Sequence, residues 1–243
     1  MENFSISFLD RRYARSTNVL DFTISLGYND EKGRGSIMKQ GLFISLEGPD
    51  GCGKSTQITF MEQYLKQKDY EVVVTREPGG TDISEQIRKV ILDRDNMAMG
   101  DTTELLLYAA ARAQLVSEVI KPAVEAGKVV ICDRFVDSSA VYQGIARGLG
   151  IDTVYAVNTY ALQGMMPKRT FFLDLPAEEG IRRKRGQHEL DRMELQKAEF
   201  HEKVAVGYRT LADMHRERII TIDAMKPADV IAAIIREELE ELL

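Results

Sequence analysis

The sequence predicts an α/β fold in which helices flank a five-stranded parallel sheet, giving three layers. Two observations support this class. Five apolar runs have the length of buried strands, at 42–46, 72–75, 129–132, 170–175 and 219–222. Segments with helical periodicity or high helix propensity separate them, at 54–68, 82–93, 102–126, 138–146, 151–164, 177–185, 190–216 and 227–241. Strands that alternate with helices are typical of βαβ units, whose parallel sheets are covered on both faces.

The first strand leads into residues 48–56, which read GPDGCGKST. This spacing matches the phosphate-binding pattern G-x-x-x-x-G-K-[ST], and the strand before it and the helix after it are the required context. Glycines let backbone N–H groups converge on phosphate oxygens, and the helix N-terminus adds partial positive charge. A glycine-rich turn that binds nothing is the alternative. We therefore predict a P-loop NTPase-type fold in which ATP is held by Gly48, Pro49, Asp50, Gly51, Cys52, Gly53, Lys54, Ser55 and Thr56.

Within this loop, Lys54 is expected to reach the β- and γ-phosphates, and the Ser55 hydroxyl is expected to bind Mg²⁺.

Composition and charge exclude several classes of protein. The 243 residues are 44% hydrophobic and 29% charged, which is typical of a globular chain. A formal net charge of -6 argues against nucleic acid as a partner, because nucleic-acid-binding proteins usually carry a basic surplus. The apolar stretches are far shorter than the roughly 20 residues of a membrane span. Cys52 and Cys132 do not suggest a disulfide framework, so we expect a cytoplasmic protein without membrane association.

Residues 1–37 carry no candidate chemistry and are expected to be a disordered extension of a domain at 38–243. Their acidic residues argue against a mitochondrial presequence. We hypothesise that translation begins at Met38, which intact-mass measurement of the native product would test.

The strand ends carry the remaining candidates, because ligands of such sheets bind beyond the carboxyl ends of the strands. Asp133 and Arg134 follow the third run; the acid suits a Mg²⁺ ligand and the arginine suits a second phosphate, although a surface ion pair has the same pattern. Arg76 opens the tight loop REPGGT after the second run, which is either a ligand-binding loop or only a turn.

Tyr108 and Arg112 lie four residues apart in LLLYAAARAQ, on one face of a predicted helix. An aromatic ring and a forked donor in this arrangement suit a nucleobase. Packing of Tyr108 in the core is the alternative.

In this order, GPDGCGKST, TREPGGT, the YAAAR-type helix, DRF with SSAVYQG, and LDLP with ELDRME closely resemble bacterial thymidylate kinases, from about residue 38 to the C-terminus. The resemblance implies that the protein transfers the γ-phosphate of ATP to dTMP with Mg²⁺ and forms a homodimer. It also implies roles for individual residues. Asp50 would contact the deoxyribose 3′-hydroxyl or help place the acceptor phosphate, and Arg134 would bind that phosphate.

For the base and sugar, the resemblance implies that Tyr108 stacks on thymine and that Arg112 donates to a thymine carbonyl. Ser138 and Gln143 would line the base pocket. Tyr142 would lie under the sugar and exclude a ribose 2′-hydroxyl, and the Arg76 loop would close over the acceptor.

The stretch at 181–192 resembles the lid of this family. Such kinases stabilise the transferred phosphoryl group with an arginine from the phosphate loop or from the lid. Gly51 stands where a loop arginine would lie, so the lid is expected to supply it from Arg183, Arg185 or Arg192, with Arg183 and Arg185 as our catalytic candidates. A solvated, charged helix end is the alternative.

Two other functions remain open. One is a P-loop nucleoside monophosphate kinase for a different acceptor, although adenylate kinases typically have Gly-Thr where Ser55 and Thr56 stand. The other is a regulatory GTP switch, which would require an Asn-Lys-x-Asp motif that the sequence lacks.

Overall fold

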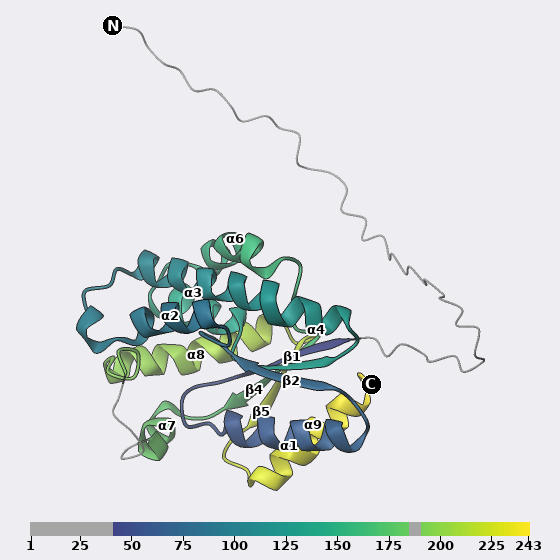
Figure 1. The fold of residues 1–243 in the computed structure, drawn as a ribbon. Coiled ribbons are helices and arrows are strands. Elements are labelled where there is room, and N and C mark those ends of the chain that lie inside the picture. Colours follow the sequence, from purple (N-terminus) through teal and green to yellow (C-terminus); the bar gives the residue numbers. More distant parts are fainter. Residues whose placement is uncertain (1–40, 185–190) are drawn as a thin grey trace, which may run out of the picture. The chain divides into compact units, whose positions relative to one another are not determined.

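A parallel sheet organises the chain, of which the computed structural model describes residues 41–184 and 191–243. Its strand order is β2-β3-β1-β4-β5 (Figure 1). All four pairings are parallel, so the strand ends meet at one edge as predicted. The five-stranded parallel sheet is confirmed, with β1 (Leu42–Glu47), β2 (Val72–Arg76), β3 (Val129–Asp133), β4 (Arg169–Asp174) and β5 (Ile219–Asp223).

Side chains alternate between the two faces of the sheet, and each face has its own apolar core. Ile44 and Ile131 pack in one cluster with residues of α1 (Lys54–Gln67) and α9 (Ala228–Glu240). Phe43 and Val130, one residue earlier in each strand, point into a cluster on the opposite side. Since successive strand residues face opposite ways, this pattern requires a helical layer on each face.

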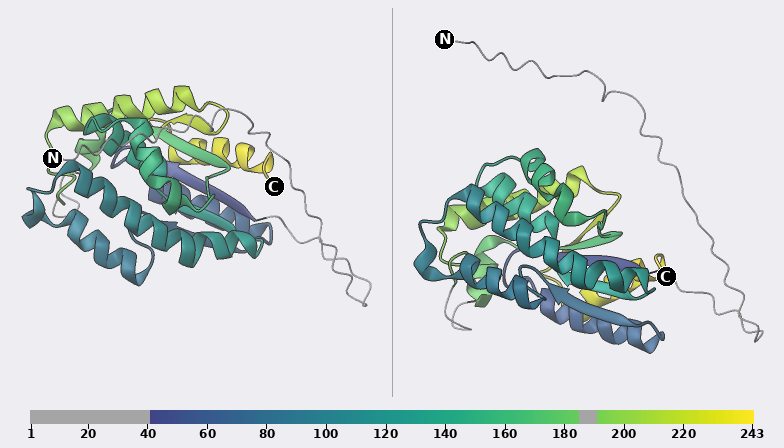
Figure 2. Two further views of the ribbon diagram at one scale, coloured as in Figure 1. Left: turned by 90° about the horizontal axis from the view of Figure 1, so that it is seen from above. Right: turned by 45° about the horizontal axis from the view of Figure 1, so that its top comes forward.

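The helices supply these layers. Figure 1 shows α1 and α9 on one face of the sheet and α2, α3, α6 and α8 on the other. In the views of Figure 2, α2 and α3 run side by side, and α6 packs against α3. The remaining bounds are α2 (Asp82–Leu92), η1 (Arg94–Asn96), α3 (Asp101–Leu115), η2 (Val116–Ile120), α4 (Lys121–Glu125), α5 (Val136–Ser139), η3 (Ala140–Ala146), α6 (Ile151–Leu162), α7 (Ala177–Lys184) and α8 (Ala198–Met214).

The expected helix over 190–216 is wrong at its start, because α8 begins at Ala198. The Asp191 carboxylate accepts hydrogen bonds from the backbone N–H groups of Met193 and Glu194, at 2.8 and 2.9 Å. Such a side-chain bond to the following backbone competes with helix formation. The segment before α8 is therefore a turn that holds residues 191–194 against the cavity described below.

Two other expected helices contain π-helical turns. The segment predicted over 102–126 contains η2 just before Pro122, which has no backbone N–H to donate to the preceding helical turn. The helix predicted over 138–146 begins earlier, at Val136, and continues through the π-helical η3.

The described residues belong to one compact unit, Met38–Leu243. The predicted disordered extension at 1–37 lies outside the described residues, as do Arg185 and the rest of 185–190 in the predicted lid. No helix within the described ranges is both long enough and apolar enough to span a membrane.

Candidate active site

The predicted phosphate loop connects β1 to α1 at the sheet edge. Gly53 caps α1 with φ 99 and ψ 15, and Gly51 has φ 78, so both use left-handed backbone that favours glycine. The Lys54 ammonium donates to the carbonyl oxygens of Gly48 and Pro49, both at 3.2 Å. These bonds hold the cation over the loop where phosphates would lie. Ser55 and Thr56 are exposed at the start of the helix.

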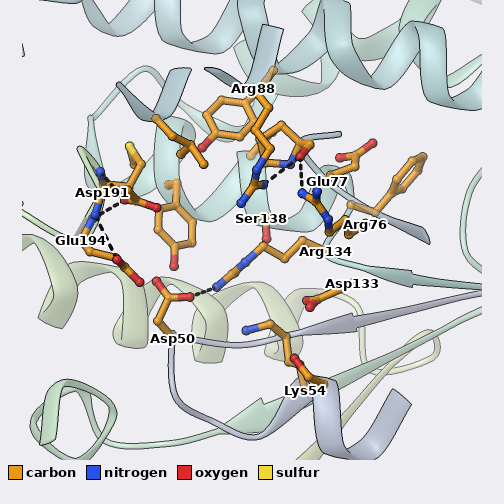
Figure 3. A pocket seen from close by; sticks show the side chains of 18 of the residues that line it. Asp50, Lys54, Arg76, Glu77, Arg88, Asp133, Arg134, Ser138, Asp191 and Glu194 are labelled. Carbon is orange, nitrogen blue, oxygen red and sulfur yellow. Dashed lines mark hydrogen bonds and ion pairs between the residues drawn. The ribbon is translucent and has the colours of Figure 1, made fainter. Parts of the chain in front are cut away.

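A cavity of about 680 Å³ extends from this loop across the edge of the sheet (Figure 3). It brings most of the sequence-predicted site residues together. Those that line it are Asp50, Gly51, Gly53, Lys54, Ser55, Thr56, Arg76, Tyr108, Arg112, Asp133, Arg134, Ser138, Tyr142, Gln143 and Arg183. Gly48, Pro49 and Cys52 belong to the same loop and are buried behind it.

Arg134 lies at the centre of the cavity, where Figure 3 shows it reaching toward Asp50. Its Nη2 donates to Asp50 Oδ1 at 2.8 Å, and its Nη1 donates to Ser138 Oγ at 3.2 Å and to the Tyr208 hydroxyl at 3.0 Å. The guanidinium also lies 5.4 Å from the centre of the Tyr142 ring. The backbone φ of 70 at Arg134 is unusual for a residue other than glycine and indicates local strain that the surrounding contacts maintain.

Glu47 accepts hydrogen bonds from several groups around Arg134, although it was not predicted as a site residue. Its Oε1 accepts from the Phe135 N–H at 2.7 Å, and its Oε2 accepts from Ser138 Oγ at 2.6 Å and from the Tyr208 hydroxyl at 2.9 Å. Burial raises the pKa of Glu47 to about 7; Asp137 adds to this rise, while Arg134 opposes it. The two hydroxyls that bind Arg134 are thus bound in turn by one buried carboxyl.

Asp133 ends β3 and is level in the sheet with Leu46 of β1, close to the phosphate loop. Its Oδ1 is buried and has no hydrogen-bond partner among the described residues. Buried polar atoms normally have partners, so an unpartnered carboxylate oxygen in the cavity that Ser55 also lines fits a hard cation such as Mg²⁺. No group of three or more His, Cys, Asp or Glu side chains within the described residues could hold a metal by itself. Phosphate oxygens would therefore have to complete the coordination.

The predicted base-binding residues Tyr108, Arg112 and Gln143 line the same cavity as the phosphate loop. Burial raises the pKa of Tyr108, whose ring lines the cavity. Arg112 is almost completely buried and paired with Glu77 and Asn158. Gln143 donates from its amide nitrogen to Glu104 Oε1 at 2.8 Å.

Arg192 was one of three candidates for the lid arginine, but it is held elsewhere in this structure. Its side chain is about 2% exposed, lies 2.7 Å from Glu104 Oε2 and donates to the Ile91 carbonyl at 2.6 Å. Glu104 is buried too and also binds Arg147. Because separating a buried ion pair leaves an uncompensated charge, Arg192 is an anchor for the turn at 191–194 rather than a free cation.

Arg183 of α7 lies beside the phosphate loop. Its Nε donates to Glu179 at 2.7 Å, and its guanidinium lies within 3.5 Å of the carbonyl oxygens of Gly51 and Ala224. A Cβ atom at Gly51 would come within 2.7 Å of the Gly180 carbonyl and 3.3 Å of Arg183 Cβ. The close packing of α7 on the loop therefore leaves no space for a side chain at Gly51.

Besides Glu77, three further charged residues line the cavity and were not predicted as site residues. Arg88 of α2 donates to the Pro78 carbonyl at 2.8 Å, beside Arg76, which donates to Glu85 at 2.9 Å. Asp191 and Glu194 line the cavity from the turn before α8. The sequence did not indicate that these side chains share a site. Arg88 lies on one face of a helix, and Asp191 and Glu194 lie in a turn that was predicted to be helical.

Comparison with known proteins connects this geometry to a family. The model of the thymidylate kinase family matches residues 46–235. A thymidylate kinase from Clostridium novyi (strain NT) is 50% identical over 194 residues, which cover 79% of this chain and 95% of the relative. One from Geobacillus sp. (strain WCH70) is 48% identical over 196 residues, covering 80% and 93%. The crystal structure of a thymidylate kinase from Ehrlichia chaffeensis superposes with a TM-score of 0.67 at 28% identity, covering 82% of this chain and 98% of that one.

Proposed function

The chain belongs to the thymidylate kinase family, and from this premise we propose how its cavity transfers the γ-phosphate of ATP to dTMP. The products are dTDP and ADP. The enzyme uses ATP as its phosphoryl donor, as its relatives do. The reaction brings two phosphate groups together, so the protein must offset their mutual repulsion and align them.

The phosphate loop binds ATP at one end of the cavity. Backbone N–H groups of 48–56 and the N-terminus of α1 face the phosphates, and Lys54 exchanges its bonds to Gly48 and Pro49 for phosphate oxygens. Ser55 and Asp133 would hold Mg²⁺, for which the unpartnered Oδ1 of Asp133 is suited. When bound, this ion neutralises charge on the phosphates.

The acceptor dTMP occupies the other end. Arg134 binds its phosphate, with Asp50 placing the guanidinium or receiving the sugar 3′-hydroxyl. Tyr108 stacks on thymine, Arg112 donates to a base carbonyl, and Ser138 and Gln143 line the base pocket. Tyr142 lies beneath the sugar, and Arg76 with its loop covers the acceptor.

As charge spreads over the transferred phosphoryl group, an arginine from α7 or the residues after it stabilises it. Arg183 is the candidate already beside the loop, at 3.5 Å from the Gly51 carbonyl oxygen. Arg185 is the second candidate and falls outside the described residues.

The main support for the proposed kinase function is that both phosphate-binding cations line one cavity. Lys54 and Arg134 line the same space, one on the loop and one at the end of the neighbouring strand β3. A nucleotide-hydrolysing switch needs the first cation and has no use for a second phosphate site. A kinase for another nucleoside monophosphate would need different side chains around the base.

A substrate panel tests the function. ADP formation is measured with dTMP, AMP, UMP or no acceptor, at fixed ATP and Mg²⁺. Rapid turnover only with dTMP supports the proposal. Turnover with AMP, or hydrolysis that ignores the acceptor, overturns it.

A homodimer is the proposed assembly. Large apolar side chains are exposed on three helices of one layer, with Ile83 of α2 at 51%, Leu106 of α3 at 53% and Tyr160 of α6 at 91%. These helices are neighbours, α2 against α3 and α3 against α6, and exposed apolar side chains on neighbouring helices favour protein contact. The proposed location is the cytoplasm, because both cysteines, Cys52 and Cys132, are free and buried thiols. Light scattering of wild type and Leu106→Asp tests the dimer: a dimer that dissociates supports it, and a wild-type monomer contradicts it.

A further inference from the structure

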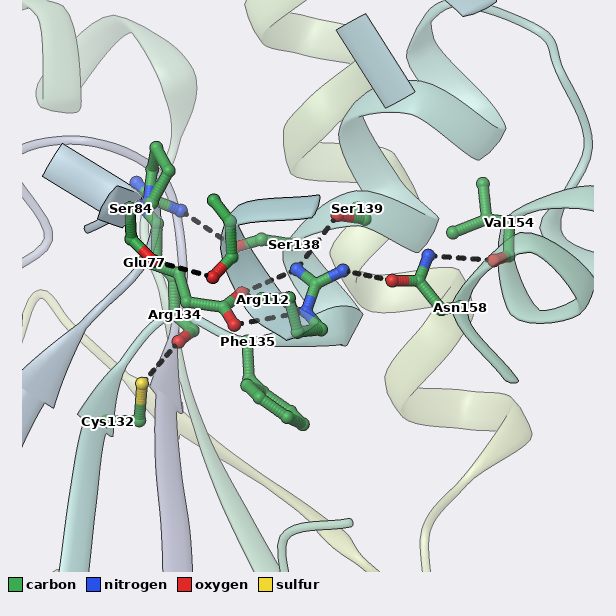
Figure 4. Close-up of polar contacts among 12 residues, drawn as sticks. Glu77, Ser84, Arg112, Cys132, Arg134, Phe135, Ser138, Ser139, Val154 and Asn158 are labelled. Atoms are coloured by element: carbon green, nitrogen blue, oxygen red, sulfur yellow. Dashed lines mark hydrogen bonds and ion pairs between the residues drawn. The ribbon is translucent and has the colours of Figure 1, made fainter. Parts of the chain in front are cut away.

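Arg112 sits in a buried polar network that reaches across three elements (Figure 4). Glu77 lies directly after β2, Arg112 lies on α3 and Asn158 lies on α6. All three are almost fully buried, at 6%, 1% and 0% exposure. A guanidinium in such a place must satisfy its N–H groups with protein or ligand acceptors.

The partners of the guanidinium account for four of its five N–H groups. Nε donates to the Glu77 carboxylate at 2.9 Å from Oε2 and 3.1 Å from Oε1, and Nη2 donates to Oε2 at 2.5 Å. Nη2 also donates to Ser139 Oγ at 3.1 Å, and Nη1 donates to Asn158 Oδ1 at 2.5 Å. The second N–H on Nη1 has no partner among the described residues, and Arg112 lines the cavity.

The two main partners are themselves fixed. Asn158 Nδ2 donates to the Val154 carbonyl at 2.8 Å, which turns Oδ1 of the amide toward Arg112. The backbone N–H of Glu77 donates to the Asp133 carbonyl at 2.9 Å, which ties the Glu77 backbone to the end of β3. The Phe135 ring lies 5.3 Å from the guanidinium. The guanidinium is therefore held in one orientation, with a single donor left over.

We propose that Glu77 and Asn158 are positioning residues that determine base selectivity, by fixing Arg112 so that one Nη1 N–H donates to the carbonyl at C4 of a pyrimidine. The inference rests on the proposed dTMP site. Only this carbonyl can discriminate, because the carbonyl at C2 is shared by thymine and cytosine. Cytosine has an amino group at C4, which is a hydrogen-bond donor. It cannot accept from the Arg112 Nη1 N–H, so this buried N–H would be left without a partner.

Charge adds a second contribution. The Glu77 carboxylate neutralises the guanidinium, so the pocket presents a donor without a net positive charge and suits an uncharged base. Glu77→Gln replaces one acceptor oxygen with an amino group that opposes the guanidinium. Arg112 then loses its fixed orientation and can rotate away from a C4 amino group, which removes the penalty on cytosine.

The test compares dissociation constants of dTMP, dUMP and dCMP by calorimetry and competition, for wild type, Glu77→Gln and Asn158→Ala. Since an unpaired buried donor is worth roughly tenfold in affinity, the preference for dTMP over dCMP should fall about tenfold in Glu77→Gln. It should fall less in Asn158→Ala, which removes one contact. The preference for dTMP over dUMP should stay at the wild-type value in both, because both bases carry the C4 carbonyl.

Two further variants separate positioning from general stability. Asp137→Asn weakens another buried acid–arginine pair, with Arg218 at 2.6 Å, outside the lining of the cavity, and should leave both preferences unchanged. Asn158→Asp keeps an acceptor oxygen for Nη1 but loses the bond to the Val154 carbonyl, and should keep more of the preference against dCMP than Asn158→Ala does.

The outcomes are distinct. If wild type fails to bind dTMP, the proposed function fails. If wild type binds dTMP and Glu77→Gln and Asn158→Ala both keep the wild-type preference against dCMP, the inference is overturned. If Glu77→Gln does not fold, Asn158→Ala and its Asp counterpart decide the question.

Discussion

The two ends of the cavity are built by different means. The phosphate loop is a contiguous stretch, 48–56, whose groups for the ligand are backbone amides and one lysine. The acceptor end collects side chains from several elements, and buried carboxylates hold its arginines: Glu47 by way of two hydroxyls for Arg134, and Glu77 for Arg112. Under the proposed assignment of the two ends, donor binding depends on local backbone conformation, whereas acceptor binding depends on buried charge balance.

The largest expected effect lies at the loop. Lys54→Ala removes a preorganised cation from the phosphates and should lower kcat by about 1000-fold. Lys66→Ala is the matched control on the same helix, because Lys66 is 58% exposed and its ion pair is with Glu62, one helical turn away. Steady-state ADP release and thermal unfolding are the measurements. A Lys54→Ala enzyme with near-normal kcat would refute the role of the loop.

Arg134→Ala should lower kcat/KM for dTMP by about 100-fold, since it removes the donor proposed for the acceptor phosphate. The KM for ATP should change little. Arg209→Ala, which removes a half-exposed arginine paired with Asp174, serves as control and should behave like wild type. Equal increases in both KM values would show that the two ends are not separate.

Glu104→Gln tests the buried charge that anchors the turn at 191–194. Glu104 binds Arg192 and Arg147, and breaking a buried ion pair costs about 3 kcal/mol. We therefore expect a decrease of this size in the free energy of unfolding by urea. The exposed pair of Glu62 and Lys66 is the comparison, and Glu62→Gln should cost less than about 1 kcal/mol. If both variants lose less than about 1 kcal/mol of unfolding free energy, the buried Glu104 contributes no more to stability than the surface Glu62.

A smaller effect should appear in the pH dependence of stability. Burial raises the pKa of Glu47 to about 7, so between its ordinary pKa and this value the folded protein binds more protons than the unfolded chain. The contribution of Glu47 to stability therefore falls as pH rises toward 7. Urea unfolding from pH 5 to pH 8 should show this loss in wild type, relative to Glu47→Gln, which does not titrate. Parallel curves for the two proteins would contradict it.

The same difference explains what the sequence could predict. The sheet, the loop and the strand-end pair Asp133 and Arg134 follow from local patterns, and the structure confirms the sheet and brings these residues into one cavity. The carboxylates at 47, 77 and 104 could not be assigned roles, because their partners lie 35 to 161 residues away along the chain.

The misplaced start of the helix at 190–216 has a related cause. Helix propensity carries no information on the turn that the Asp191 side chain makes with the backbone. Arg192 was considered a lid cation for the same reason, since its pairing with Glu104 is visible only in three dimensions.

Glu47 allows the two ends of the cavity to be tested separately. It immediately precedes the phosphate loop in sequence, yet its bonds described above are with groups of the acceptor end. The measurement is calorimetric binding of dTMP and of a non-hydrolysable ATP analogue to wild type and Glu47→Gln. We expect the variant to bind dTMP about tenfold more weakly, since Ser138 and Tyr208 lose their acceptor and release Arg134, and to bind the ATP analogue as wild type does. Weakened binding of the ATP analogue with unchanged binding of dTMP would contradict the account.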